Sequence, residues 1–158
     1  SRADLAAMPA VAPVVIRKGA LGASRPAADL TISPQHRILV RPGIAQRMFG
    51  TAELLVAATA LVGVPGIEVC DDADSVTYIH LLFDRHEVVM SNGAETESLY
   101  PGPQAMVGLG NAANEILMLF PELRNGLPEG YGARPFASGK KARNLAMRHS
   151  ANARPLVS

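Results

Sequence analysis

Ser33 and His36 are the first residues whose types and spacing suggest chemistry. The serine hydroxyl lies three residues before the imidazole, and Pro34 bends the chain between them. At such a bend both groups can point at one place, where the hydroxyl donates to a carbonyl oxygen and the imidazolium protonates a leaving nitrogen. The structural alternative is that Ser33 begins a turn and His36 is an ordinary strand histidine.

Asp84 and His86 form a second candidate pair. On a regular strand their i, i+2 spacing places both side chains on one face, where Asp84 can orient the imidazole or deprotonate a nucleophile. His80 has the same parity, so His80, Asp84 and His86 are also weak candidates for a metal site, although zinc usually takes its ligands from separate elements. A solvated hairpin corner is the structural alternative.

A small hydrolase, metal-assisted or built from Ser33 or Ser98 with His86 and Asp84, stays open. The sequence has no Gly-x-Ser-x-Gly motif to support a serine hydrolase. It also has no Walker A motif and no dinucleotide-binding glycine pattern, so we expect no cofactor. Cys70 is the only cysteine, which rules out an internal disulfide.

The candidate residues lie in a chain whose apolar runs and turn residues predict a mainly β core. Pro34 suits a strand bend or a sheet edge, and Asn92-Gly93 is a strong type I′ turn signal. A hairpin is predicted from 46–49 and 53–56, and a short helical turn over 57–62. We predict strands over residues 11–17, 30–33, 37–41, 76–83 and 87–91.

The chain divides into three predicted parts. Residues 1–10 are expected to be disordered, residues 11–103 to form the β domain, and residues 104–158 to form a helical C-terminal extension with helices over 111–120 and 138–150. From Arg134 onward there are six Lys or Arg and no acid, which indicates a solvated helix face or a docking strip for an acidic partner. The net charge of +1 argues against a dedicated nucleic-acid binder, and no apolar run is long enough for a membrane span.

Taken in order, these motifs resemble the hedgehog/intein (Hint) autoprocessing module. Ser33-Pro-Gln-His36 is similar to the Thr-x-x-His motif of a Hint strand, with Ser in place of Thr. The apolar segment 53–62 is similar to the Hint segment that leads into a small helical turn. The segments 80–86 and 97–103, His-Leu-Leu-Phe-Asp-Arg-His and Glu-Ser-Leu-Tyr-Pro-Gly-Pro, resemble a bacterial branch of the family, Hint_2.

The resemblance implies a twisted, horseshoe-shaped β core and protein self-cleavage. In such a module a cysteine attacks the preceding carbonyl and forms a thioester. His36 would protonate the scissile amide nitrogen, and Ser33 would polarise the carbonyl. Asp84 and His86 would activate the nucleophile and assist the second step.

Two departures from the family pattern limit this expectation. No cysteine lies near residue 1, and no His-Asn pair follows Gly93. We therefore expect a truncated or catalytically lapsed Hint module, whose substrate in a precursor is its own upstream polypeptide and which self-cleaves only if an upstream cysteine segment is present. The alternative is a non-catalytic β-rich interaction module.

The remaining expectations concern partners and location. A truncated module would leave a strand edge unpaired, and exposed edges pair between chains, so we expect a homodimer or strand exchange, and no nucleic-acid or membrane partner. Analogy with bacterial members of the branch suggests secretion, and otherwise the protein would be cytoplasmic.

Overall fold

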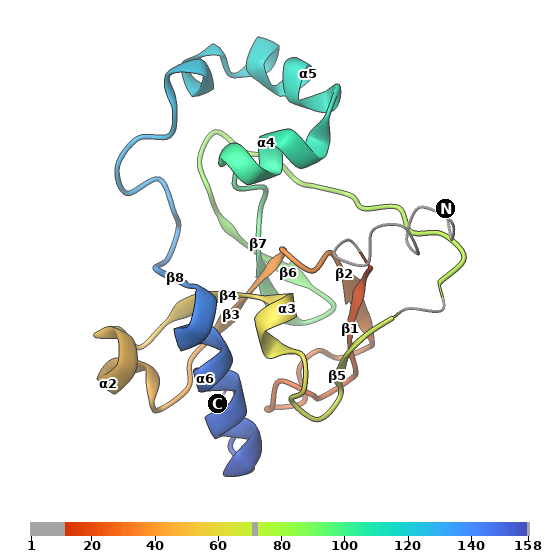
Figure 1. The fold of residues 1–158 in the computed structure, drawn as a ribbon, viewed down its shortest axis with the longest axis vertical. Coiled ribbons are helices and arrows are strands. Elements are labelled where there is room, and N and C mark those ends of the chain that lie inside the picture. The colour runs from red at the N-terminus through yellow and green to blue at the C-terminus, as the bar shows by residue number, and fades with distance from the viewer. Residues whose placement is uncertain (1–11, 71–72, 158) are drawn as a thin grey trace.

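The fold is built from two small β-sheets, and helices pack on them (Figure 1). The computed structural model describes residues 12–70 and 73–157. The N-terminal segment 1–10, for which the sequence predicts disorder, lies outside the described residues.

The smaller sheet has three antiparallel strands in the order β2-β1-β5. Its strands are β1 (Val14–Ile16), β2 (Leu30–Ile32) and β5 (Ile67–Val69). All three residues of β1 are buried, as expected for the β-branched central strand of a sheet. The strand predicted over 11–17 is therefore present in its described part.

The larger sheet has five strands in the order β6-β7-β3-β4-β8. Its strands are β3 (Arg37–Val40), β4 (Leu54–Ala57), β6 (Val88–Ser91), β7 (Ala94–Glu97) and β8 (Phe136–Ala137). All neighbours are antiparallel except β4 and β8. The predicted bend at Pro34 is confirmed, because it passes the chain from β2 in one sheet to β3 in the other.

The predicted turn at Asn92-Gly93 is also confirmed. Asn92 has φ 49° and Gly93 has φ 78°, the left-handed region that a type I′ turn requires at both positions. The turn joins β6 to β7, with Ser91 opposite Ala94. In this register Ala94 and Thr96 share one face of β7, whereas Glu95 and Glu97 share the other. Thr96 and Glu97 are both buried.

Five α-helices and one 3₁₀-helix complete the described fold. They are α2 (Ala45–Phe49), α3 (Ala58–Leu61), α4 (Pro103–Leu109), α5 (Ala112–Leu119), η2 (Pro121–Asn125) and α6 (Gly139–Ala151). The predictions of α3, α5 and α6 are confirmed within one or two residues. No helix in the described part of the chain is long and apolar enough to cross a membrane.

Two strand predictions were wrong. Residues 46–49 belong to α2, so the predicted hairpin with 53–56 does not form, and β4 pairs with β3 instead. Residues 76–83 contain no strand, and their apolar side chains Ile79, Leu81 and Phe83 are exposed. A run of β-branched and aromatic residues becomes a strand only where a neighbouring strand accepts its backbone hydrogen bonds, and no β-ladder partner pairs with this segment in the described chain.

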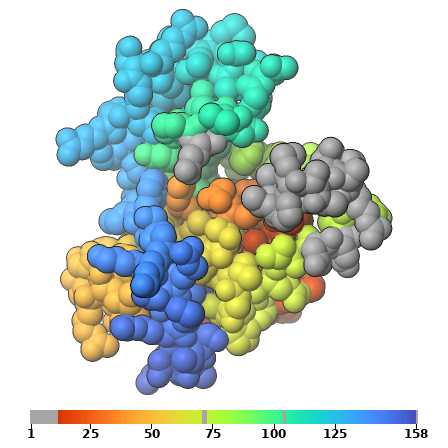
Figure 2. Space-filling view, viewed as in Figure 1, coloured from red at the N-terminus to blue at the C-terminus, as the bar shows by residue number. Residues whose placement is uncertain are grey.

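The residues after 103 pack into the same core as the sheets. Ala137, Ala142, Leu145 and Leu156 belong to one buried cluster with β1, β3 and β4 side chains. Figure 2 shows this part of the chain, in blue-green to blue, covering one side of the body from α4 and α5 at one end to α6 at the other. The C-terminal extension is thus helical, with β8 as an additional short strand, and the domain boundary at residue 103 stays a prediction.

Candidate functional site

The bend that carries Ser33 and His36 is fixed by backbone hydrogen bonds. The His36 N–H donates to the Ser33 carbonyl at 3.1 Å and closes a tight turn. From the start of α3, the Ala58 N–H donates to the His36 carbonyl and the Thr59 N–H donates to the Pro34 carbonyl, each at 2.9 Å. These bonds place the turn at a fixed position above the larger sheet.

Ser33 and His36 line the same groove, which has a volume of about 600 Å³. Tyr78 and His80 line it from the segment before β6, and Glu97 lines it from the end of β7. The rim on the far side belongs to α4, in the projecting part of the molecule seen in Figure 1. No described residue forms a hydrogen bond with the Ser33 hydroxyl or the His36 ring, so both groups are available to a substrate.

His86 lies behind the groove and is fully enclosed, with no exposed side-chain surface. Its Nδ1 accepts a hydrogen bond from the Ala133 N–H at 2.9 Å, and its Nε2 lies 3.1 Å from a carboxylate oxygen of Glu97. Because an N–H points at Nδ1, the ring proton of the neutral imidazole is on Nε2, which donates to Glu97. Both ring nitrogens of His86 therefore already have a partner within the described residues.

Glu97 is the centre of the polar network. Its carboxylate accepts hydrogen bonds from the Arg37 backbone N–H at 2.9 Å and from the Arg37 guanidinium at 2.9 and 3.1 Å. Together with the bond from His86, these contacts satisfy a carboxylate whose side chain is only 6% exposed. In the described residues, no buried side-chain nitrogen or oxygen lacks a partner.

An aromatic cluster surrounds this network. Tyr100 and Phe136 meet edge to face with ring centroids 4.9 Å apart, and both rings contact His86 in the same manner. The Arg37 guanidinium lies 4.3 Å from the centroid of the Phe136 ring, in a cation–π contact. With these rings beside it the Glu97 side chain is only 6% exposed and the Arg37 side chain 25%, and this partial shielding from water strengthens the electrostatics of the pair.

The pKa values of His36 and Glu97, two of the titratable groups that line the groove, are both lowered. Burial lowers the pKa of His36 because it disfavours the imidazolium, although the carboxylate of Glu97 partly opposes this. Burial alone would raise the pKa of Glu97, but the hydrogen bond from His86 and the charge of Arg37 outweigh it and lower that pKa. The site is thus a neutral imidazole beside an ionised carboxylate at neutral pH.

The predicted pairing of Asp84 with His86 was wrong in its geometry. The two residues are not on a strand, Asp84 is exposed, and the carboxylate that bonds to His86 belongs to Glu97. The hydrolase triad of Ser33 or Ser98 with His86 and Asp84 therefore does not assemble. The Ser98 hydroxyl instead accepts a hydrogen bond from the Glu87 backbone N–H.

The alignment of His80, Asp84 and His86 on one face was wrong for the same reason. His80 is exposed and His86 is buried. Among residues 12–70 and 73–157, no group of three or more His, Cys, Asp or Glu is arranged to hold a metal ion. The catalytic roles assigned to Ser33, His36, Asp84 and His86 stay predictions, and of these residues only Ser33 and His36 line the groove.

Sequence reasoning missed Glu97, Arg37 and Phe136 as parts of the site. The Asn92-Gly93 turn fixes only that Glu97 shares a face of β7 with Glu95, and no local signal indicated that Glu97 is buried. No local signal indicated that Ala133 and Phe136, which follow the last groove residue by more than 20 positions, would close over His86.

Cys70 lies at the end of β5, where its N–H donates to the Pro13 carbonyl at 2.8 Å. It is half-buried and not in a disulfide. Burial raises the pKa of Tyr78 in the groove, and Cys70 raises it further when ionised. The single thiol of the sequence is thus near one end of the groove but does not line it.

Comparison with protein families agrees with this arrangement. A family model described as the Hint domain matches residues 1–103, which is well over half of the 158 residues. The chain belongs to the Hint domain family. No curated protein and no solved structure is similar enough to this chain to count as a match.

The Hint match includes most of the site but not all of it. The turn at Ser33 and His36, the Arg37–Glu97 ion pair and most of the groove lie within residues 1–103, whereas the α4 rim of the groove lies beyond them. Ala133 and Phe136, which hold His86 and cover Arg37, lie beyond the matched residues. In this Hint domain, the C-terminal extension therefore completes the environment of the candidate site.

Proposed function

We propose that this Hint domain carries out peptide self-cleavage through an N→S acyl shift in its precursor, with His36 as the group that transfers the proton. The observation that carries the proposal is the placement of Ser33 and His36 in one groove, on a rigid turn, with the ring and the hydroxyl both available. This is the arrangement that amide cleavage needs, because a peptide nitrogen leaves only when it is protonated.

The lowered pKa of His36 suits both halves of that reaction. As a neutral imidazole, His36 accepts the proton of the attacking thiol. The imidazolium that forms in a buried place is a stronger acid than one in water, and it passes the proton to the amide nitrogen as the C–N bond breaks. The carbonyl carbon is then bonded to sulfur, and a second thiol or water releases the upstream segment and restores the cysteine thiol.

Ser33 and Glu97 support this transfer in different ways. The Ser33 hydroxyl donates to the carbonyl oxygen, where negative charge develops during attack. The Glu97 carboxylate stabilises the imidazolium of His36 while it exists, because their electrostatic interaction is favourable. His86 and Arg37 hold Glu97 in place and are positioning residues.

The nucleophile in this proposal is an upstream cysteine supplied by the precursor. Cys70 is the only cysteine of the printed sequence, and it lies in mid-chain at the end of a strand. A chain with the printed sequence alone is therefore predicted not to cleave itself, and the proposal concerns a precursor in which a cysteine-bearing segment precedes Ser1.

The test measures the first-order rate of self-cleavage of such a precursor by intact-mass spectrometry. His36→Ala should slow cleavage by about 10²-fold or more, in the range of a lost general acid–base group. His80→Ala is the matched control, since His80 is an exposed histidine that lines the same groove. It should leave the rate within about twofold, and Cys70→Ser should do the same.

Two results would overturn the proposal. If His36→Ala and His80→Ala slow cleavage equally, the proton transfer does not depend on His36. If Cys70→Ser abolishes cleavage, the nucleophile is the mid-chain thiol and the upstream assignment is wrong. Circular dichroism of each variant shows that a lost rate does not come from unfolding.

A second candidate function is a non-catalytic interaction module, favoured by the apolar surface of the projecting helices. Val107 of α4 and Met118 and Leu119 of α5 are 83%, 68% and 74% exposed. A second copy of the chain would cover such surface. Light scattering should then show a dimer at high concentration that Leu119→Ser weakens, and a monodisperse monomer at every concentration would contradict this function.

A further inference from the structure

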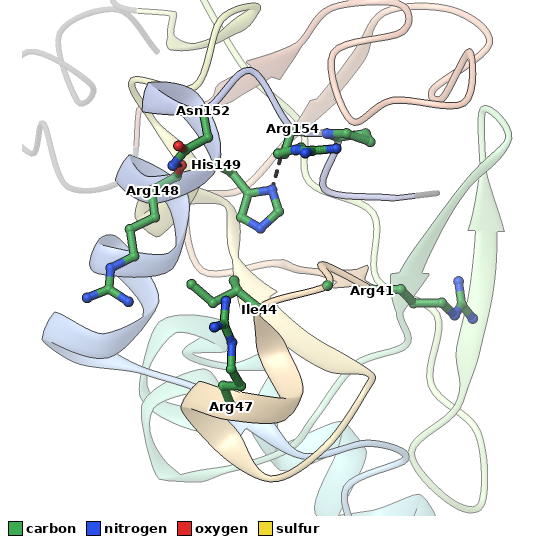
Figure 3. A pocket seen from close by; sticks show the side chains of 9 residues that line it. Arg41, Ile44, Arg47, Arg148, His149, Asn152 and Arg154 are labelled. Atoms are coloured by element: carbon green, nitrogen blue, oxygen red, sulfur yellow. Dashed lines mark hydrogen bonds between the residues drawn. The ribbon is translucent and has the colours of Figure 1, made fainter.

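A second pocket, of about 660 Å³, lies between α2 and the C-terminal end of α6. Figure 3 shows the two helices with the pocket side chains between and around them. Four arginines and a histidine line it: Arg41, Arg47, Arg148, Arg154 and His149. Neither Ser33 nor His36 takes part, so this pocket is separate from the groove.

The charges in this pocket are not balanced by acids. Arg41 is neutralised by ion pairs with Glu53 and Glu95, and in Figure 3 its side chain extends away from His149. Arg47, Arg148 and Arg154 form no ion pair with any residue that the structure describes. Three arginines with no ion-pair partner in the described residues therefore line one pocket of a protein whose net charge is only +1, and in Figure 3 their side chains leave α2, α6 and the segment after α6 in different directions.

His149 adds an available ring nitrogen to this cluster. The residue is only 6% exposed, and its Nδ1 donates to the Arg154 carbonyl at 3.2 Å. No described residue forms a hydrogen bond with Nε2, and Figure 3 shows the ring projecting from α6 into the space above Arg47. A ligand in the pocket would meet this nitrogen.

The pocket wall is built before any ligand arrives. The Arg154 N–H donates back to the His149 carbonyl at 3.1 Å, so two hydrogen bonds fix the segment that carries Arg154. The next residues are tied down as well, because the Arg41 N–H donates to the Leu156 carbonyl at 2.9 Å. A fixed wall lowers the entropy that a ligand loses on binding.

The ordinary role of basic residues at a helix end explains only part of the cluster. Arg148 and His149 are in the last turn of α6, where cations complement the helix dipole. Arg47 comes from α2, and Arg154 comes from the segment after α6. These three arginines from three elements give the pocket a positive charge that no described acid balances, and a multiply charged anion would neutralise it.

We propose that this pocket binds a multiply charged phosphate group through Arg47, Arg148 and Arg154, with His149 as an additional polar contact. The guanidinium fork matches the oxygen geometry of phosphate. The pocket volume is in the range of small-molecule sites, roughly 300–1,000 Å³. The bound phosphate belongs to a soluble phosphorylated molecule or to a lipid headgroup.

The experiment titrates inorganic pyrophosphate into the folded protein and measures heat at moderate salt. Arg148→Gln and Arg154→Gln should each weaken binding by about tenfold, as expected for a lost charge-assisted contact. Arg143→Gln is the matched control, because it removes the same charge from an exposed position of α6 that does not line the pocket. It should leave the affinity unchanged.

A parallel arm distinguishes the two sources of phosphate. Co-sedimentation with phosphatidylcholine vesicles that contain phosphatidic acid, lost in Arg148→Gln but not in Arg143→Gln, would support a lipid headgroup. Pyrophosphate binding with the same pattern, without sedimentation, would support a soluble ligand. Binding of neither probe, or equal weakening by all three substitutions, would overturn the proposed site.

Discussion

Removal of the buried Glu97 carboxylate should be the most destabilising single change in the polar network. Glu97→Ala deletes the bonds from the Arg37 N–H at 2.9 Å, from the Arg37 guanidinium at 2.9 and 3.1 Å, and from His86 at 3.1 Å. It leaves the fully buried His86 Nε2–H without an acceptor. It also leaves the Arg37 charge facing Phe136 with no counter-ion.

The size of the effect follows from the exposure of the two partners. Removal of one member of a buried ion pair costs about 3–5 kcal/mol. The Arg37 side chain is 25% exposed and can regain some water, so the lower end, about 3 kcal/mol, is expected for Glu97→Ala. For a domain of this size each kcal/mol shifts Tm by about 2–4 °C, so Tm should fall by roughly 6–12 °C.

Thermal unfolding followed by far-UV circular dichroism measures this change, and Glu68→Ala is the matched control. Glu68 is also a strand glutamate paired with an arginine, Arg17, but both side chains are more than half exposed, at 56% and 53%. Water and salt screen such a pair, so Tm should hardly move. Equal losses of Tm in the two variants would refute the reasoning that burial gives the Glu97 network its strength.

The same network predicts a dependence on pH. Because the pKa of Glu97 is lowered in the folded protein, the unfolded chain takes up the proton first as the pH falls. The stabilisation is therefore complete above the unfolded value, about 4.5, and is lost as the pH falls through the folded value. Glu97→Ala should remove this part of the acid sensitivity of the free energy of unfolding.

Four further predictions concern other parts of the fold. Because burial lowers the pKa of His36, stability should fall as the pH drops below about 6.5, and urea titrations of His36→Gln should lack this step. Leu145→Ala empties a fully buried position and should cost about 2–5 kcal/mol by urea unfolding. Gly22→Ala should cost about 2–4 kcal/mol of unfolding free energy, because its new Cβ would lie 2.3 Å from the Cβ of Pro155. Gly19→Ala should cost only about 1 kcal/mol, because open space surrounds that position. Similar losses in the two variants would contradict the close approach of Gly22 to Pro155. A chain that ends at Pro103 should show no cooperative unfolding by calorimetry, because residues 104–157 complete the core.

Local signals in the sequence predicted the elements that depend on few neighbours. The Asn92-Gly93 turn needs only two residues that tolerate positive φ, and the bend at Pro34 needs only a residue without an amide donor. Helix α6 was predicted from its pattern to within one residue at each end. The resemblance to Hint domains rested on motif order and holds over residues 1–103.

Elements that depend on distant partners could not be predicted in this way. The segment 76–83 has the composition of a strand, but the structure gives it no ladder partner. A buried carboxylate at Glu97 is explained only by Arg37, 60 residues away, and by His86, 11 residues away. The wrong partner, Asp84, was chosen because sequence spacing alone favours near neighbours over those brought together by folding.

The central claim is that this Hint domain cleaves a precursor through a thioester, and mass spectrometry with and without dithiothreitol tests it most directly. The precursor that carries a cysteine-bearing segment before Ser1 is incubated under both conditions. The account predicts that dithiothreitol accelerates the loss of the upstream segment, and that His36→Ala abolishes this acceleration. An unchanged intact mass under both conditions, in a wild-type protein shown to be folded, would contradict it and favour the interaction module.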